Sequence, residues 1–324
     1  QGYADLNFLI PELVERARYR KGPYFAEIGD FSSAGGVDFD LVRSIPKGMV
    51  SLTLGSFEFQ RALAAGTATV AGGDLTAALE YYHYDGPWDR PDDYERWNGF
   101  LGYARGDASK GWSVTGMGSD GEWLATDQIP RRAVDEGLVD RYGLIDPGPR
   151  GSTSRYSLSG EVHSGTASTL SSLSAYAIKY DFNLFSNFTY FLDNPVNGDQ
   201  FEQIDDRWIF GLGLDHRWSG HLGSRHHNST VGFDLRFDDI ANGLYDTVDL
   251  ERTSTTRQDD VRQLGGGLWG ETWIGLTPTL RLNLGLRADY YRAKVDALRE
   301  VNSGTADDWL LNPKATLVWR VAPW

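Results

Sequence analysis

The sequence predicts an all-β fold, an antiparallel β-barrel that crosses a membrane. Three observations predict it: apolar residues recur at every second position, the polar faces carry full charges in mid-strand, and short connections alternate with long ones. Successive side chains of a strand point to opposite faces, so this alternation makes one apolar face and one polar face. A soluble sandwich with one wet face alternates equally well. The charged mid-strand positions and the asymmetric connections favour a membrane barrel with a wide, wet interior.

Composition narrows the class of protein. The 324 residues include 38 Gly and no Cys, and the formal net charge is -14. Without Cys, disulfides and thiolate metal sites are excluded, and the negative charge argues against nucleic acid as a partner. No apolar run approaches the roughly eighteen residues of a membrane helix. We find no signal peptide and expect the abrupt start at Gln1 to be a fragment boundary.

Alternation predicts twelve strands, beginning with a hairpin. Residues 50–54 carry apolar side chains at even positions and 57–59 at odd positions, which places a tight turn at Gly55-Ser56. Alternation is clearest in 207–215 and 230–238. We expect these two to pair antiparallel, with even positions of the first and odd positions of the second facing lipid. The remaining strands are predicted at 75–82, 96–103, 112–118, 155–163, 175–184, 261–274, 280–289 and 312–321.

The connections after the first hairpin are of two lengths. The short ones are predicted near 71–73, 105–111, 164–169, 219–228 and 276–279, and the long ones at 85–95, 119–153, 185–206, 239–258 and 292–308. Aromatic residues crowd the strand ends, namely Tyr81, Tyr82, Tyr84, Trp88, Trp208, Trp218, Tyr290 and Tyr291. Short turns on one side, long loops on the other and aromatic girdles at both interfaces are typical of outer-membrane barrels.

The stretch from Ile10 to Phe39 has a different character. Pro11 suits the first turn of a short helix, 14–21 is β-like but charged, and glycines break the chain at Gly22-Pro23 and Gly35-Gly36. The residues alone predict a compact α+β piece. The order I-P-E-L-V-E-R, K-G-P, a lone glycine and G-G-V-x-F resembles the last third of the plug domain of TonB-dependent outer-membrane receptors. V-S-L-T-L-G-S-F-E-F-Q-R-A is similar to the hairpin that follows that plug.

The resemblance implies that residues 1–44 are the C-terminal part of the plug and 45–324 the N-terminal portion of the barrel. Such barrels have about 22 strands, so the twelve present are expected to form an open half-shell. Its edge strands, at 47–54 and 311–322, are expected not to pair with each other. Two departures from the family pattern are Arg18, where an acid is usual, and Lys21, where arginine is usual.

The resemblance also implies a function, active transport across the outer membrane of a Gram-negative bacterium. The ligand would be scarce (a siderophore, metal complex, cobalamin or oligosaccharide), and the energy would come from the TonB protein, whose contact segment is expected outside this fragment. Outer-membrane lipid and lipopolysaccharide would be further partners. A passive porin-like channel is the alternative, and a barrel-borne hydrolase is a remote one.

Motifs for chemistry were sought, and no catalytic, cofactor-binding or metal-binding residue is predicted. The pattern G-x-G-x-x-G occurs at 116–121 and 265–270, but neither stretch opens a helix after its strand, as a dinucleotide site requires. His221, His226 and His227 share a short turn without a carboxylate at ligand spacing. No G-x-S-x-G elbow is present. We therefore expect a protein that is not an enzyme, and its ligand-binding residues stay unassigned.

Charged residues give the remaining predictions. Four cations of the plug-like stretch are expected to face a polar wall, because an apolar surface would desolvate them at great cost. They are Arg16, Arg18, Arg20 and Lys21, with Glu80, Glu161 or Asp181 as expected partners. Acids crowd the long connections, at 85–93, 193–206, 238–260 and 307–308. They are either solvated loops or a vestibule for cationic ligands or the divalent ions of lipopolysaccharide.

Overall fold

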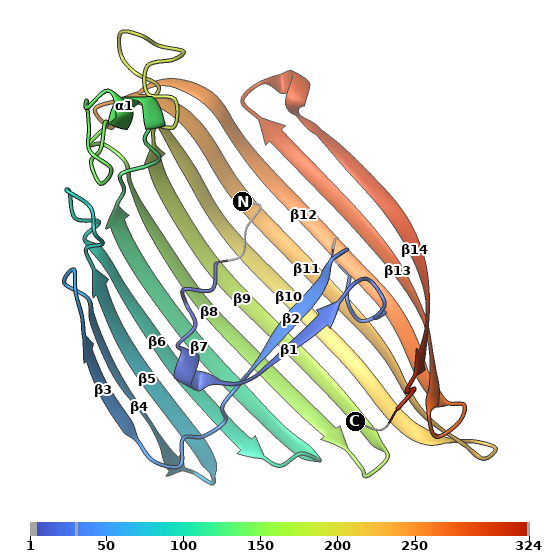
Figure 1. Ribbon diagram of the computed structural model, residues 1–324. Coiled ribbons are helices and arrows are strands. Elements are labelled where there is room, and N and C mark those ends of the chain that lie inside the picture. The colour runs from blue at the N-terminus through green and yellow to red at the C-terminus, as the bar shows by residue number, and fades with distance from the viewer. Residues whose placement is uncertain (1–4, 30–31, 323–324) are drawn as a thin grey trace.

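A wide antiparallel sheet, which we call the wall, curves around a small N-terminal segment in the computed structural model (Figure 1). The structure describes residues 5–29 and 32–322, so residues 1–4, 30–31 and 323–324 of the predicted ranges lie outside it. The strands of the wall are β3 (Met49–Leu54), β4 (Gln60–Val70), β5 (Gly73–Tyr84), β6 (Tyr94–Gly106), β7 (Lys110–Leu124), β8 (Arg150–Gly165), β9 (Thr169–Ser186), β10 (Phe201–Leu222), β11 (Arg225–Val248), β12 (Glu251–Gly275), β13 (Leu280–Ala297) and β14 (Gly304–Trp319).

The wall is an open half-barrel. Its strands are hydrogen-bonded in chain order from β3 to β14, and these two strands form its edges within the described residues. The predicted number of strands, the antiparallel fold and the unpaired edges are therefore confirmed. The second predicted strand, 57–59, instead lies in the turn between β3 and β4, where Phe57 and Glu58 have positive φ. Two short helices lie in the connections, α1 (Arg131–Asp135) and η2 (Glu300–Asn302). No helix of the described chain is long and apolar enough to cross a membrane.

The N-terminal segment, residues 5–44, forms its own two-stranded sheet. The 3-10 turn η1 (Pro11–Leu13) leads into β1 (Val14–Lys21), which pairs antiparallel with β2 (Gly35–Leu41). Pro11 occupies the first helical turn, as expected. Gly35 has φ +116°, and a Cβ at this position would collide with the carbonyl oxygen of Arg20. Glycine is therefore required where the chain turns back to pair with β1.

The predicted register of the best-defined strand pair is confirmed. Leu212 on β10 lies directly opposite Leu235 on β11, and Phe210 lies opposite Phe237. Arg236 lies opposite Gly211 on the other face. Since paired residues of an antiparallel ladder share one face, the apolar side chains of both strands form one surface.

Several strands are longer than predicted. The stretch 239–258 was predicted as a long loop, but β11 runs to Val248 and β12 starts at Glu251. The turn between them consists of Asp249 and Leu250, both with positive φ. The prediction was wrong because it took acidic residues as a sign of a loop. Two of these acids, Asp239 and Asp246, lie within β11.

Aromatic residues form two rows on the outward, apolar face. Trp208 and Trp218 are ten residues apart on β10, and Trp309 and Trp319 have the same spacing on β14. Ten residues of strand span about 33 Å. With the 35–45° tilt of membrane barrels, the two rows lie about 25 Å apart in height, which matches the apolar band of outer-membrane barrels. The outward face therefore has the dimensions of a membrane-spanning surface.

Candidate functional site: contacts between the N-terminal segment and the wall

The inner face of the wall is polar, and it carries a row of paired charges. On each of four neighbouring strands, an arginine and an aspartate stand two positions apart and so point to the same face. The pairs are Asp205–Arg207, Arg236–Asp238, Arg257–Asp259 and Arg287–Asp289. All four aspartates are buried. A buried carboxylate without its cation would be strongly destabilising, so these pairs allow a polar inner surface to pack against the N-terminal segment.

The first contact of the segment with the wall centres on Glu80 of β5, and we call it the Glu80 contact. The Glu80 side chain is 1% exposed. One carboxylate oxygen accepts hydrogen bonds from Arg96 (3.1 Å) and Asn98 (2.9 Å) of β6, and the other accepts from Nε of Arg61 on β4 (2.7 Å). Arg61 also donates from both terminal nitrogens to the carboxylate of Glu12 in η1, at 2.7 Å each. Arg61 therefore bridges a carboxylate of the wall and one of the segment.

An apolar cluster lies beside the Glu80 contact. Ile10 and Leu13 of the segment are 1–2% exposed and pack with Leu63 of β4 and Phe100 of β6. Ile45, where the chain enters the wall, completes the cluster, and its N–H donates to Thr67 Oγ1 at 2.8 Å. Burial of these side chains removes them from the wet interior, and each contributes about 1.5–3 kcal/mol. This cluster anchors the end of the segment that leads into the wall.

The second contact, which we call the Arg287 contact, lies on the opposite part of the wall. Arg287 of β13 is 2% exposed and donates two hydrogen bonds to Asp234 of β11, at 2.7 Å each, and one to Asp289 at 2.7 Å. A further N–H of Arg287 donates to the carbonyl oxygen of Ala26 at 3.4 Å. The Ala26 N–H donates to Glu271 of β12 at 3.0 Å. Both backbone polar groups of Ala26 are therefore satisfied by the wall.

Glycine allows the close approach at the Arg287 contact. A Cβ on Gly29 of the segment, or on Gly267 of β12, would overlap the guanidinium of Arg287. Glycines of the segment and of the wall therefore both border this side chain. Nearby, Lys314 of β14 donates to the carbonyl oxygen of Pro23 at 2.7 Å. Every hydrogen bond described here between the segment and this part of the wall uses the segment's backbone.

Three of the four predicted contact cations have partners that differ from the expected ones. Within the segment, Arg18 pairs with Asp40 at 2.9 Å, Arg16 lies 3.8 Å from the same carboxylate, and Arg20 pairs with Asp38 and Glu27. The expected wall acids are engaged by the wall itself, Glu80 by Arg61 and Arg96, Glu161 by His163 and Asp181 by Lys179. A role of Arg16, Arg18, Arg20 and Lys21 in contacts with the wall stays a prediction.

The sequence analysis missed the residues that make the described contacts. It expected cations on the segment and acids on the wall, whereas at the Glu80 contact the acid is Glu12 and the bridging cation is Arg61. A signal was present in Glu12, which follows a proline and precedes a buried leucine. The Arg287 contact gave no signal on the segment side, because Ala26 contributes only its backbone. The two G-x-G-x-x-G stretches lie inside β7 and β12, as strands and not as helix-opening loops.

Comparison with known proteins decides the family. Residues 80–324 match the family described as TonB dependent receptor-like, beta-barrel. The chain belongs to this family. The matched stretch begins within β5 and includes most of the wall. The TonB-dependent receptors are a family of transport receptors of the Gram-negative outer membrane. No curated protein sequence matches the chain.

Solved structures share the fold of this TonB-dependent receptor. The siderophore receptor PiuA from Acinetobacter baumannii superposes with a TM-score of 0.76 at 15% identity, covering 94% of this chain and 51% of PiuA. The ferric citrate transporter FecA, in its unliganded form, has a TM-score of 0.76 at 12% identity, covering 94% and 47%. The copper transporter OprC has 0.72 at 18%, covering 96% and 49%. The chain thus spans about half the length of these proteins.

Proposed function

We propose that this chain is part of a receptor that takes up a scarce metal complex across the outer membrane, with energy from TonB. In this proposal residues 1–44 are the end of the plug and residues 45–324 the first part of the barrel wall. Lipid contacts the outward apolar face, and lipopolysaccharide surrounds the long-loop end. The metal complex includes a ferric siderophore, and cobalamin and oligosaccharides are the alternative ligand classes. A metal complex is favoured because the similar solved structures include a siderophore receptor, a ferric citrate transporter and a copper transporter.

The observation that carries the proposal is how the segment is attached to the inner face. Its described contacts are a small apolar cluster, the polar contacts at Glu80 and at Arg287, and further contacts of the wall with Asn7, Phe8, Pro23 and Arg43. Hydrogen bonds to charged groups contribute about 1.5–3 kcal/mol each, and the wall itself is held by a continuous strand ladder that the segment does not join. A segment held in this way can be pulled from the wall without unfolding the wall. A plug that admits ligand on demand requires this property.

A disulfide across the Arg287 contact tests the proposal. A Cβ built on Gly285 would lie 3.0 Å from the Cβ of Ala26, and a disulfide joins Cβ atoms about 3.5–4.5 Å apart, so a small shift suffices. The chain has no Cys of its own. We expect cells carrying the receptor with Ala26→Cys and Gly285→Cys to take up iron only after reduction. Each single variant is the matched control and should be active in both redox states.

The outcomes separate the parts of the proposal. The ligand class is tested by supplying the cells with radiolabelled ferric citrate, ferric siderophores or copper(II). If the cells take up none of these, a metal-complex ligand is contradicted. Uptake that persists in cells without TonB contradicts energy coupling and supports the passive channel. Equal uptake by the oxidised and reduced double variant, with the disulfide verified by mass spectrometry, contradicts movement of the segment.

A further inference from the structure

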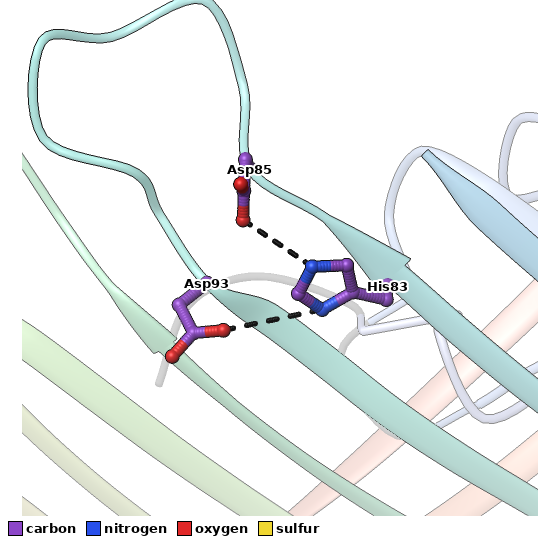
Figure 2. A group of neighbouring side chains, drawn as sticks. All are labelled: His83, Asp85 and Asp93. Atoms are coloured by element: carbon purple, nitrogen blue, oxygen red, sulfur yellow. Dashed lines mark ion pairs between the residues drawn. The ribbon is translucent and has the colours of Figure 1, made fainter. Parts of the chain in front are cut away.

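A histidine and two aspartates converge at the base of a long connection between two strands of the wall (Figure 2). His83 lies near the end of β5, Asp85 follows it by two positions, and Asp93 lies directly before β6. The backbone closes the base of this connection, because the Asp92 N–H donates to the Asp85 carbonyl at 2.8 Å. The two ends of the connection are thus held side by side, and each contributes a carboxylate next to one imidazole.

The three side chains are close enough to share one ion. Nε2 of His83 lies 3.3 Å from Asp85 Oδ1, and Nδ1 lies 4.0 Å from Asp93 Oδ1. One ligand atom from each residue lies within 4.8 Å of the other two. A zinc ion binds such atoms at about 2.0–2.2 Å, which places neighbouring ligand atoms about 3–3.5 Å apart. The two carboxylates face different nitrogens of the ring, so an ion held by one nitrogen requires the carboxylate at the other to swing toward it. The Asp93 side chain has room to do so because it is 69% exposed.

The charges around His83 call for a cation. Glu95 of β6 lies directly opposite His83 in the register, so a third acid stands at the next strand, where its carboxylate accepts a hydrogen bond from Trp97. Residues directly opposite on one face have Cβ atoms about 4.5–5.5 Å apart. The group differs from a purely acidic cluster because the imidazole offers a nitrogen ligand. One nitrogen with several carboxylate oxygens suits a first-row transition ion, whereas calcium takes six to eight oxygens.

We propose that His83, Asp85 and Asp93 bind a divalent transition-metal ion of the zinc type. The imidazole supplies nitrogen, the two aspartates supply oxygen, and water fills the open positions. Such an ion ties both ends of the connection 86–92 to the strand ends. The site lies on the connection between β5 and β6, apart from the Glu80 and Arg287 contacts. The proposal therefore stands independently of the function proposed above.

Metal titration of the purified receptor in detergent, without an affinity tag and after treatment with chelator, tests the site. We expect one ion of zinc bound per chain, with Asp93→Asn and His83→Gln each weakening binding by about tenfold or more. Asn suits position 93 because Asp93 has φ +46°, a region that asparagine tolerates. The matched control replaces His221, His226 and His227 by Gln, which should leave zinc affinity unchanged.

A second measurement locates the ion. Anomalous diffraction at the zinc edge should place one peak between the His83 imidazole and the Asp93 carboxylate. Undiminished binding by Asp93→Asn, or loss of binding in the control variant, overturns the proposal. Should His83→Gln fail to fold, Asp93→Asn still decides the outcome, because this exposed side chain packs against little and its replacement has nearly the same shape.

Discussion

The two contacts of the N-terminal segment with the wall differ in what the segment contributes. At the Glu80 contact it contributes a side chain, the carboxylate of Glu12, which is a third exposed. At the Arg287 contact it contributes only the N–H and C=O groups of Ala26, and the charged groups all belong to the wall. The first contact depends on residue identity in the segment. The second depends on how closely its backbone approaches the wall.

This difference predicts which substitutions weaken each contact. A side-chain change at Glu12 removes its pair with Arg61 from the Glu80 contact, whereas only added bulk disturbs the Arg287 contact from the segment side. Wall substitutions affect both, because both are built on buried ionised groups whose partners are fixed by neighbouring strands. Removal of one member of such a group leaves the other buried without compensation. The predictions below are ordered by the size of the expected effect.

The largest effect is expected for Arg287→Ala. It leaves Asp289 buried without its cation, removes the bidentate partner of Asp234 and takes a donor from Ala26. We expect a loss of about 3–5 kcal/mol in the free energy of unfolding, measured by denaturant titration in detergent. Hydrogen exchange should increase at residues 24–29 and not at 10–13. Arg262→Ala, which removes an exposed pair with Asp239, should cost about 0–1 kcal/mol. Equal losses of unfolding free energy in the two variants would contradict the assignment of Arg287 as a buried contact residue.

Glu80→Gln is expected to have the next largest effect. The substitution keeps the shape but removes the charge that two arginines and an asparagine share. Arg61 retains Glu12, whereas Arg96 loses its ion-pair partner. We expect a loss of about 2–3 kcal/mol in the same titration. Faster exchange should be confined to residues 10–13, the reverse of the Arg287→Ala pattern. Faster exchange at both ends would mean that the contacts are coupled.

A smaller effect is expected for Gly29→Ala, which tests the backbone contact from the segment side. The added Cβ overlaps the Arg287 guanidinium, so either the segment or the Arg287 side chain has to move. Overpacking of this kind costs about 1–2 kcal/mol. Gly36→Ala is the matched control, because its Cβ would meet only Ile28, at an ordinary 3.7 Å. Exchange of the amides at 24–29 should increase for the first variant alone, and an unchanged rate for Gly29→Ala would refute the close approach.

The smallest effect is expected for Glu12→Gln, about 0–1 kcal/mol, because the pair with Arg61 is partly exposed. The hydrogen bonds from Arg61 lower the pKa of Glu12 from its ordinary value of 4.5. A lowered folded-state pKa stabilises the protein above the unfolded-state value, and this contribution is lost as pH falls through the folded-state pKa. The difference between wild type and variant should therefore be constant near neutral pH and disappear in acid. If the difference instead grew in acid, the pKa of Glu12 would be raised and not lowered in the folded state.

The sequence alone determined the faces and the number of the strands. A period of two is a local property, so Leu212, Leu235 and their neighbours revealed which side of each strand is apolar. The antiparallel order followed in the same way, whereas the first hairpin has a connection of residues 55–59 and not the predicted tight turn at Gly55-Ser56. Strand ends were less predictable. Asp259 looks like a loop residue until Arg257, two positions away on the same strand, is seen to pair with it.

Only the tertiary structure decided which groups of the segment contact the wall. Ala26 and Glu271 are 245 positions apart, and they meet because the curvature of the whole sheet carries β12 and β13 back over the segment. A backbone contact of this kind leaves no mark in the residue type of Ala26. The group of His83, Asp85 and Asp93 was determined partly by the sequence and partly by the tertiary structure. The spacing of His83 and Asp85 is visible in the sequence, but Asp93 joins them only because β5 and β6 pair across the connection.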